Sequence, residues 1–188
     1  MKIATWNVNS IRVRLPQVLE WLSKESPDVL CLQETKIRDE DFTLEAVRDA
    51  GYHAVYCGQK SYNGVATLSR APAGEVVTAL PGLGDNQKRL LAATIDGVRV
   101  VNVYVPNGEA VGSEKYLYKL SWLELLERWL REELQRYPRL AVLGDYNIAP
   151  EERDVHDPKQ WQGRVLFSEQ ERAAFRDLTG LGLVDIFR

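Results

Sequence analysis

The sequence predicts an α/β fold in which two packed β-sheets are each covered on the outer face by helices. Apolar residues recur at helical spacing near both ends of the chain, whereas short β-rich stretches fill the middle. Continuous apolar runs at 29–32 and 140–143 are typical of strands that are covered on both faces. Together these patterns favour an α/β sandwich over a doubly wound parallel sheet.

The first part of the chain is predicted to alternate strands with helices. We expect strands at 2–9 and 29–32, a helix through 13–22, and a second helix over 39–50. Pro27 ends the first helix because proline cannot continue it. Gly51 closes the second helix, since glycine tolerates the left-handed backbone found there.

The remaining elements follow from β-rich stretches and then from two amphipathic helices. We expect strands at 52–57, 62–69, 75–80, 89–95, 98–105 and 139–143, helices at about 113–136 and 169–179, and a strand or turn from 183 to 187. Asp96-Gly97 predicts a two-residue hairpin turn. Ser168 and Glu171 form a capping box for the last helix.

Composition is that of an ordinary soluble domain, with 45% apolar and 27% charged residues. The net charge of −3 gives no basic excess, so a nucleic-acid surface would have to be local. Cys31 and Cys57 lie in apolar runs without metal-ligand spacing, which predicts buried free thiols in a reducing compartment. No long apolar segment occurs, so we expect a cytoplasmic protein without membrane contact.

Three buried strands each end in a compact polar group. These groups are Asn7, Glu34, and the pair Asp145 and Asn147, which in extended chain would face the same side. Taken singly, each is most often a turn, a cap or a solvated residue. Together they predict a site for a hard cation, because Mg²⁺ prefers one or two carboxylates with water and phosphate.

Five ordered motifs resemble those of a known family. They are Trp6-Asn7-Val8-Asn9-Ser10, Leu32-Gln33-Glu34-Thr35-Lys36, Tyr62-Asn63-Gly64-Val65-Ala66, Asn102-Val103-Tyr104-Val105-Pro106-Asn107-Gly108 and Gly144-Asp145-Tyr146-Asn147-Ile148-Ala149-Pro150. In this order they resemble the exonuclease III-type apurinic/apyrimidinic endonucleases, within the deoxyribonuclease I-like superfamily. The resemblance implies a four-layer α/β/β/α sandwich, with residues 1–188 forming one domain of that type.

The resemblance also implies roles for five residues. Glu34 resembles the carboxylate that binds Mg²⁺ or Mn²⁺, and Asn7 would orient Glu34 or a water on the metal. Asp145 resembles the carboxylate that aligns or deprotonates the attacking water. Asn147 and Tyr104 resemble groups that hydrogen-bond the scissile phosphate, although a tyrosine in the pattern of Tyr104 alone is more often a packed aromatic.

Candidate DNA contacts are mostly cations near these motifs. We expect backbone contacts from Lys36, Asn63, Lys88, Arg89 and Arg164, with Arg12 and Gln87 as further candidates. Each of the cations alone is more often a solvated charge, and Asn63-Gly64 alone is more often a turn. The alternating charges of 113–136 favour a solvent face over a DNA groove, and His53 and His156 are expected to be incidental or structural.

The family pattern continues beyond residue 188, where relatives carry a further aspartate motif and a closing Asp-His pair. We therefore expect a C-terminally truncated domain with little nuclease activity alone and a tendency to self-associate, although the complete protein would be a monomer. The implied function is cleavage 5′ to abasic sites in double-stranded DNA, with 3′→5′ exonuclease activity at 3′ ends. Two alternatives are a non-catalytic DNA-binding fragment and a phosphodiesterase acting on a phosphoinositide or phospholipid.

Overall fold

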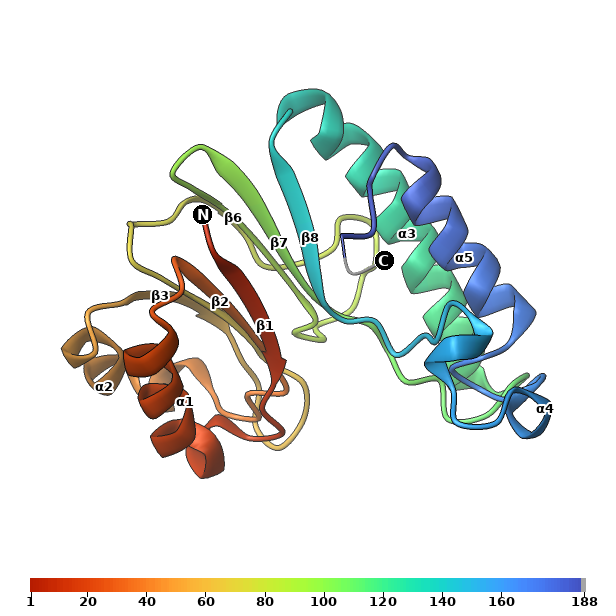
Figure 1. Ribbon diagram of the computed structural model, residues 1–188, viewed down its shortest axis with the longest axis horizontal. Helices are drawn as coiled ribbons and strands as arrows, with labels where there is room; N and C mark the ends of the chain where they lie inside the picture. The colour runs from red at the N-terminus through yellow and green to blue at the C-terminus, as the bar shows by residue number, and fades with distance from the viewer. Residues whose placement is uncertain (187–188) are drawn as a thin grey trace. The chain divides into compact units, whose positions relative to one another are not determined.

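The computed structural model describes residues 1–186 and shows two compact units, each built from separated stretches of chain (Figure 1). The first unit comprises Met1–Leu80, Gly84–Tyr104 and Tyr137–Asp145. The second comprises Pro81–Leu83, Val105–Arg136 and the chain from Tyr146 onward. Both β-sheets belong to the first unit, and the two longest helices after residue 100 belong to the second.

One sheet of the first unit has the strand order β1-β2-β4-β3. Its strands are β1 (Ile3–Asn7), β2 (Val29–Gln33), β4 (Val65–Ser69) and β3 (His53–Cys57). β1 and β2 are parallel, whereas β4 pairs with both neighbours in antiparallel register. Parallel pairing brings the carboxyl ends of β1 and β2 to the same edge, with Asn7 opposite Gln33.

Helices cover the outer face of this sheet (Figure 1). They are α1 (Ile11–Glu25) and α2 (Leu44–Asp49). The short 3₁₀ turn η1 (Asp39–Asp41) precedes α2 and is exposed. Val18 and Leu22 of α1 pack with Leu30, Leu32 and Leu68 in one buried cluster. These aliphatic side chains are essentially excluded from water, so the hydrophobic effect fixes α1 against the sheet.

The other sheet has the order β5-β6-β7-β8. Its strands are β5 (Gly74–Val77), β6 (Leu90–Ile95), β7 (Val98–Tyr104) and β8 (Leu140–Asp145). β6 and β7 form the expected hairpin, in which Asp96 (φ 48°) and Gly97 (φ 72°) both adopt the left-handed backbone. β7 and β8 are parallel, which places Tyr104 opposite Asp145 at their carboxyl ends.

The two sheets pack face to face through small and β-branched side chains. Val29 and Cys31 of β2 contact the cluster that contains Ile95 and Val100, and every residue of β2 is buried. Asn102 of β7 adds a polar connection between the sheets. Its side-chain nitrogen donates to the carbonyl oxygens of Leu32 and Ala66, and its oxygen accepts from Gln33.

The second unit is built around two long helices that run side by side (Figure 1). Its elements are α3 (Glu114–Arg136), η2 (Glu152–Asp154), α4 (Pro158–Trp161) and α5 (Glu169–Gly180). Trp122, Leu126 and Leu130 form the buried stripe of α3. Ser168 and Glu171 cap α5 reciprocally, as the sequence predicts.

The α/β class with two mixed, mostly antiparallel sheets is confirmed. The single helix expected over 39–50 is wrong, because the extended backbone of Phe42 (ψ 141°) separates η1 from α2. No strand begins within 183–186, and Phe187 lies outside the described residues. The grouping of 1–188 into one domain stays a prediction. Within the described part of the chain, no helix combines the length and apolarity needed to cross a bilayer.

Candidate metal and phosphate site

The strand ends of the first unit bring Asn7, Glu34 and Asp145 together. The side-chain nitrogen of Asn7 donates to Glu34 Oε1 at 2.8 Å and to Asp145 Oδ2 at 2.7 Å. Asn7 Oδ1 in turn accepts from the backbone N–H of Asn9 at 3.0 Å, which fixes the rotation of the carboxamide. One amide therefore holds two carboxylates whose positions in the sequence are 111 residues apart.

The local backbone explains why Glu34 points into this cluster. β2 ends at Gln33, and Glu34 adopts a left-handed conformation (φ 53°) that turns the chain out of the sheet. The N–H of Ser10 donates to the Glu34 carbonyl at 2.7 Å, which joins this turn to the one after β1. The side chain of Glu34 is about one fifth exposed, so water and a ligand can reach it.

Lys36 and Tyr104 complete the surroundings of Glu34. Lys36 Nζ lies 2.8 Å from Glu34 Oε2 and also donates to the side-chain oxygen of Asn9. Partial burial alone would raise the pKa of Glu34, but hydrogen bonds from Asn7, Lys36 and Tyr104 outweigh it and hold that pKa below its ordinary value. Glu34 is therefore an ionised carboxylate at neutral pH, as a metal ligand must be.

Tyr104 stands at the end of β7, opposite Asp145 in the parallel pair. The guanidinium of Arg89 lies over its ring, 4.7 Å from the centroid, and Arg89 also donates to the Tyr104 carbonyl. Burial, together with the negative charge of Glu34, raises the pKa of Tyr104 to about 12. Its hydroxyl thus keeps its proton at physiological pH and can donate a hydrogen bond.

The donor set fits a hard divalent cation. Two carboxylates and an amide at one strand edge are the ligand types that Mg²⁺ accepts while it retains water and substrate phosphate. Among residues 1–186, no group of three or more His, Cys, Asp or Glu side chains gathers as a closed protein cage. The geometry of Asn7 favours an orienting role over direct ligation, because its nitrogen faces both carboxylates and its oxygen faces Asn9.

Asn147 belongs to the second unit and lies in the irregular segment after β8. The extended chain assumed for residues 145–147 is wrong, since β8 ends at Asp145 and Asn147 has φ 49°. Its side-chain nitrogen donates to the Val105 carbonyl at 3.0 Å, and its side-chain oxygen accepts from Asn107 at 3.4 Å. The side chain is thus fixed by contacts within its own unit.

The remaining sequence candidates have diverse surroundings. Asn63 is buried, and its amide donates to Gln59 and Gln87 at 3.2 and 3.3 Å. The Lys88 carbonyl accepts from the N–H of Gly64, so the loops that carry Asn63 and Lys88 are joined. Arg164 is exposed in the second unit, while exposed Arg12 pairs with Asp41 at 3.2 Å.

Sequence reasoning missed Lys119, which is fully buried on α3. The charges of 113–136 predicted a solvent face, yet Lys119 and Glu133 both point away from solvent. Helical spacing could have predicted this burial. Lys119 follows Tyr116 by three residues and precedes Leu123 by four, which places it on the apolar stripe of the helix.

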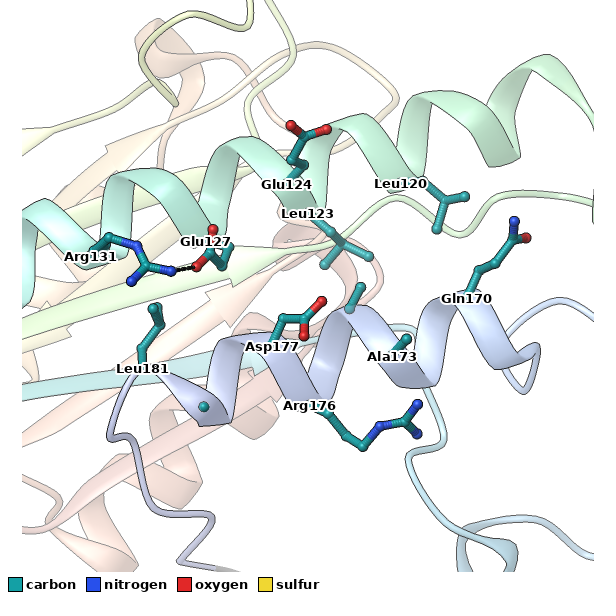
Figure 2. A pocket seen from close by; sticks show the side chains of 12 residues that line it. Leu120, Leu123, Glu124, Glu127, Arg131, Gln170, Ala173, Arg176, Asp177 and Leu181 are labelled. Atoms are coloured by element: carbon teal, nitrogen blue, oxygen red, sulfur yellow. Dashed lines mark hydrogen bonds and ion pairs between the residues drawn. The ribbon is translucent and has the colours of Figure 1, made fainter.

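An open groove of about 670 Å³ lies between α3 and α5 in the second unit, and Figure 2 shows the side chains that line it. Its lining is aliphatic and charged, and comprises Leu120, Leu123, Glu124, Glu127, Arg131, Gln170, Ala173, Ala174, Arg176, Asp177, Gly180 and Leu181. Arg131 pairs with Glu127 across one helical turn (Figure 2). Because this lining includes no histidine, cysteine or hydroxyl group, we assign no chemistry to the groove.

Comparison with known proteins identifies the family of this chain. The Endonuclease/Exonuclease/phosphatase family matches residues 4–183. A Bacillus subtilis protein named exodeoxyribonuclease is 35% identical over 196 residues, which cover all of this chain and 75% of that protein. An AP endonuclease from Archaeoglobus fulgidus is 42% identical, with a TM-score of 0.97 over the whole chain and 73% of that structure. The 3′ phosphatase NExo from Neisseria, solved with a product DNA hairpin, is 47% identical, with a TM-score of 0.97 over 98% of this chain and 72% of that one. The chain therefore belongs to the endonuclease/exonuclease/phosphatase family, as its ordered motifs predicted.

Proposed function

We propose that the protein is a divalent-metal DNA-repair nuclease that cuts the backbone 5′ to abasic sites and also removes nucleotides from 3′ ends. The observation that carries the proposal is the Asn7 carboxamide held between the Glu34 and Asp145 carboxylates. The names of the relatives, exodeoxyribonuclease and AP endonuclease, support a DNA-repair nuclease. A related structure with bound product DNA supports DNA as the substrate.

In this proposal Glu34 holds the metal ion, which we expect to be Mg²⁺ or Mn²⁺. When bound, the ion would neutralise phosphate charge and stabilise the leaving 3′-oxygen. Asn7 keeps the Glu34 and Asp145 carboxylates in fixed orientations through its two hydrogen bonds. This preorganisation lowers the cost of ordering the site when the substrate arrives.

Asp145 orients the attacking water and accepts its proton, since a carboxylate is the available base at this strand edge. The Tyr104 hydroxyl, which stays protonated, donates to a phosphate oxygen where negative charge develops. Asn147 supplies an amide hydrogen bond to the same phosphate, the role implied by its motif. Lys36, Lys88, Arg89, Asn63 and Arg164 would contact the DNA backbone without reading its sequence.

The direct test is Mg²⁺-dependent nicking of a duplex with one abasic site. The protein at its full encoded length is compared with Glu34→Gln and Asp145→Asn. Each change should reduce kcat by at least about 100-fold, because a positioned ligand or base is lost without a change in size. Glu45→Gln and Asp49→Asn serve as controls on exposed positions of α2 and should leave kcat unchanged. Near-normal rates for both site variants would refute the assignment.

The same protein should be tested on other substrates. A gel-shift in chelator measures DNA binding without cleavage; if binding occurs but no metal supports cutting, the protein is a non-catalytic DNA-binding module. Hydrolysis of a phosphoinositide or phospholipid headgroup, with DNA left intact, would instead place it on another branch of the superfamily. Duplexes with recessed 3′ ends and with 3′-phosphates distinguish end trimming from abasic-site incision.

A further inference from the structure

The second unit contains a buried ion pair to which the proposed mechanism assigns no role. Lys119 of α3 and Glu171 of α5 have fully buried side chains, and Lys119 Nζ lies 2.5 Å from Glu171 Oε1. The ammonium also donates to two backbone carbonyls, those of Asn107 at 3.1 Å and Asn147 at 2.6 Å. These three acceptors match the three protons of a lysine ammonium.

Glu171 is anchored as firmly as its partner. Its carboxylate accepts hydrogen bonds from the N–H of Leu166 and from both the N–H and the hydroxyl of Ser168. The hydroxyls of Ser168 and Tyr116 are 2.7 Å apart, which connects this cap back to α3. The ion pair is therefore a rigid element, and Lys119 has little freedom to move.

The two carbonyls that Lys119 binds belong to segments that meet at the Asn147 side chain. Asn147 donates to the Val105 carbonyl and accepts from Asn107, so segment 105–107 fixes its carboxamide. Asn147 also has a left-handed backbone, which asparagine tolerates better than most residues but less freely than glycine. A charge-assisted bond to its own carbonyl is well placed to hold that conformation.

We propose that Lys119 is a positioning residue for Asn147, and that the Lys119–Glu171 pair fixes the backbone conformation from which the Asn147 amide binds phosphate. The inference rests on the proposed function, in which Asn147 hydrogen-bonds the phosphate. Buried ion pairs contribute little net stability compared with apolar replacements of similar size. A requirement for two defined carbonyl contacts explains a buried lysine here better than stability does.

The test separates charge balance from positioning. Lys119→Met alone should destabilise the protein, because it leaves the Glu171 carboxylate buried without its partner. The double variant Lys119→Met/Glu171→Gln removes both charges, while the glutamine oxygen can still cap α5. We expect the double variant to regain most of the urea midpoint, yet to keep a kcat reduced tenfold to about 100-fold with KM changed little. Lys115→Met, on an exposed position of the same helix, should match the parent in both measurements.

Two further measurements make the outcome decisive. In an Asn147→Ala background, the double change Lys119→Met/Glu171→Gln should lower kcat by less than about twofold, since Lys119 and Asn147 act as one unit. The side-chain amide signals of Asn147 in NMR spectra of the double variant should shift or broaden, whether or not the protein cuts DNA. Recovery of parental kcat together with the urea midpoint, or unchanged Asn147 signals, would overturn the proposal. If the parent cuts no nucleic acid, the proposed function fails, and the NMR signals alone decide whether Lys119 positions Asn147.

Discussion

Replacing Asn102 by alanine removes a fully buried carboxamide that joins the two sheets of the first unit. Three hydrogen bonds are lost: two that its nitrogen donates, to Leu32 O at 3.1 Å and Ala66 O at 2.9 Å, and one that its oxygen accepts from Gln33 at 2.7 Å. Because Gln33 directly precedes Glu34, this contact also supports the strand end that carries the proposed metal ligand.

The expected cost follows from these contacts. A buried hydrogen bond contributes about 1 kcal/mol net, so the loss of three amounts to about 3 kcal/mol. The vacated space adds a smaller cavity cost, because neighbouring side chains relax only in part. A loss of about 3 kcal/mol corresponds to more than about 100-fold in the unfolding equilibrium.

Urea unfolding followed by tryptophan fluorescence measures this free energy. Asn102→Ala should lower the midpoint with an unchanged m-value, since the surface exposed on unfolding is nearly the same. Asn86→Ala, at an exposed loop position, is the matched control and should change the free energy of unfolding by less than about 0.5 kcal/mol. If Asn102→Ala costs less than about 1 kcal/mol, the buried carboxamide does not hold the sheets together as argued.

Three further predictions concern the strand ends. Gly144→Ala should lower the free energy of unfolding by more than about 3 kcal/mol, because an added Cβ would lie 1.9 Å from the Val103 carbonyl oxygen at a φ of 149°. Gly74→Ala has open space around the added Cβ and is the control in the same urea titration. Burial and the Glu34 charge raise the pKa of Tyr104 to about 12. The unfolded chain therefore loses this proton first, and stability should fall between about pH 10 and pH 12, less steeply in Tyr104→Phe when urea midpoints are measured across that range. Burial opposes ionisation of Glu34, but the hydrogen bonds from Asn7, Lys36 and Tyr104 outweigh it and lower the pKa of Glu34. The stability that these hydrogen bonds add is therefore present above about pH 4.3 and is lost as the pH falls. Asn7→Leu should raise that pKa in a carboxyl-carbon NMR titration; an unchanged value would contradict the bridging role.

Much of the site was predictable because it depends on strand ends. A continuous apolar run followed by a polar residue predicts a buried strand with a polar tip, and this reasoning selected Asn7, Glu34 and Asp145. Of these three strands only β2 is fully buried, whereas β1 and β8 are partly exposed. Parallel pairing of β1 with β2 and of β7 with β8 then places these tips at common edges. The polar pattern was enough to expect these side chains at a common edge, whereas the parallel pairings are known only from the structure.

Other features depend on contacts that no local pattern encodes. Asn102 lies inside an apolar run, and its partners in β2 and β4 are known only once the sheets are packed. Lys119 has the charge of a solvated residue, and its burial follows from Glu171, which is 52 residues away. Asparagine tolerates the left-handed backbone seen at Asn147, but the hydrogen bonds that hold its side chain come from residues about 40 positions away.

The claim that the Asn7, Glu34 and Asp145 cluster holds a hard cation can be tested by crystals grown with Mn²⁺. An anomalous difference map should show a peak within about 2.2 Å of a Glu34 carboxylate oxygen, and the peak should disappear in Glu34→Gln. The ion would then have displaced Lys36 from its position beside Glu34, and Lys36 Nζ would contact phosphate instead. A well-ordered cluster without such a peak at millimolar Mn²⁺, or a peak that persists in Glu34→Gln, would contradict the account.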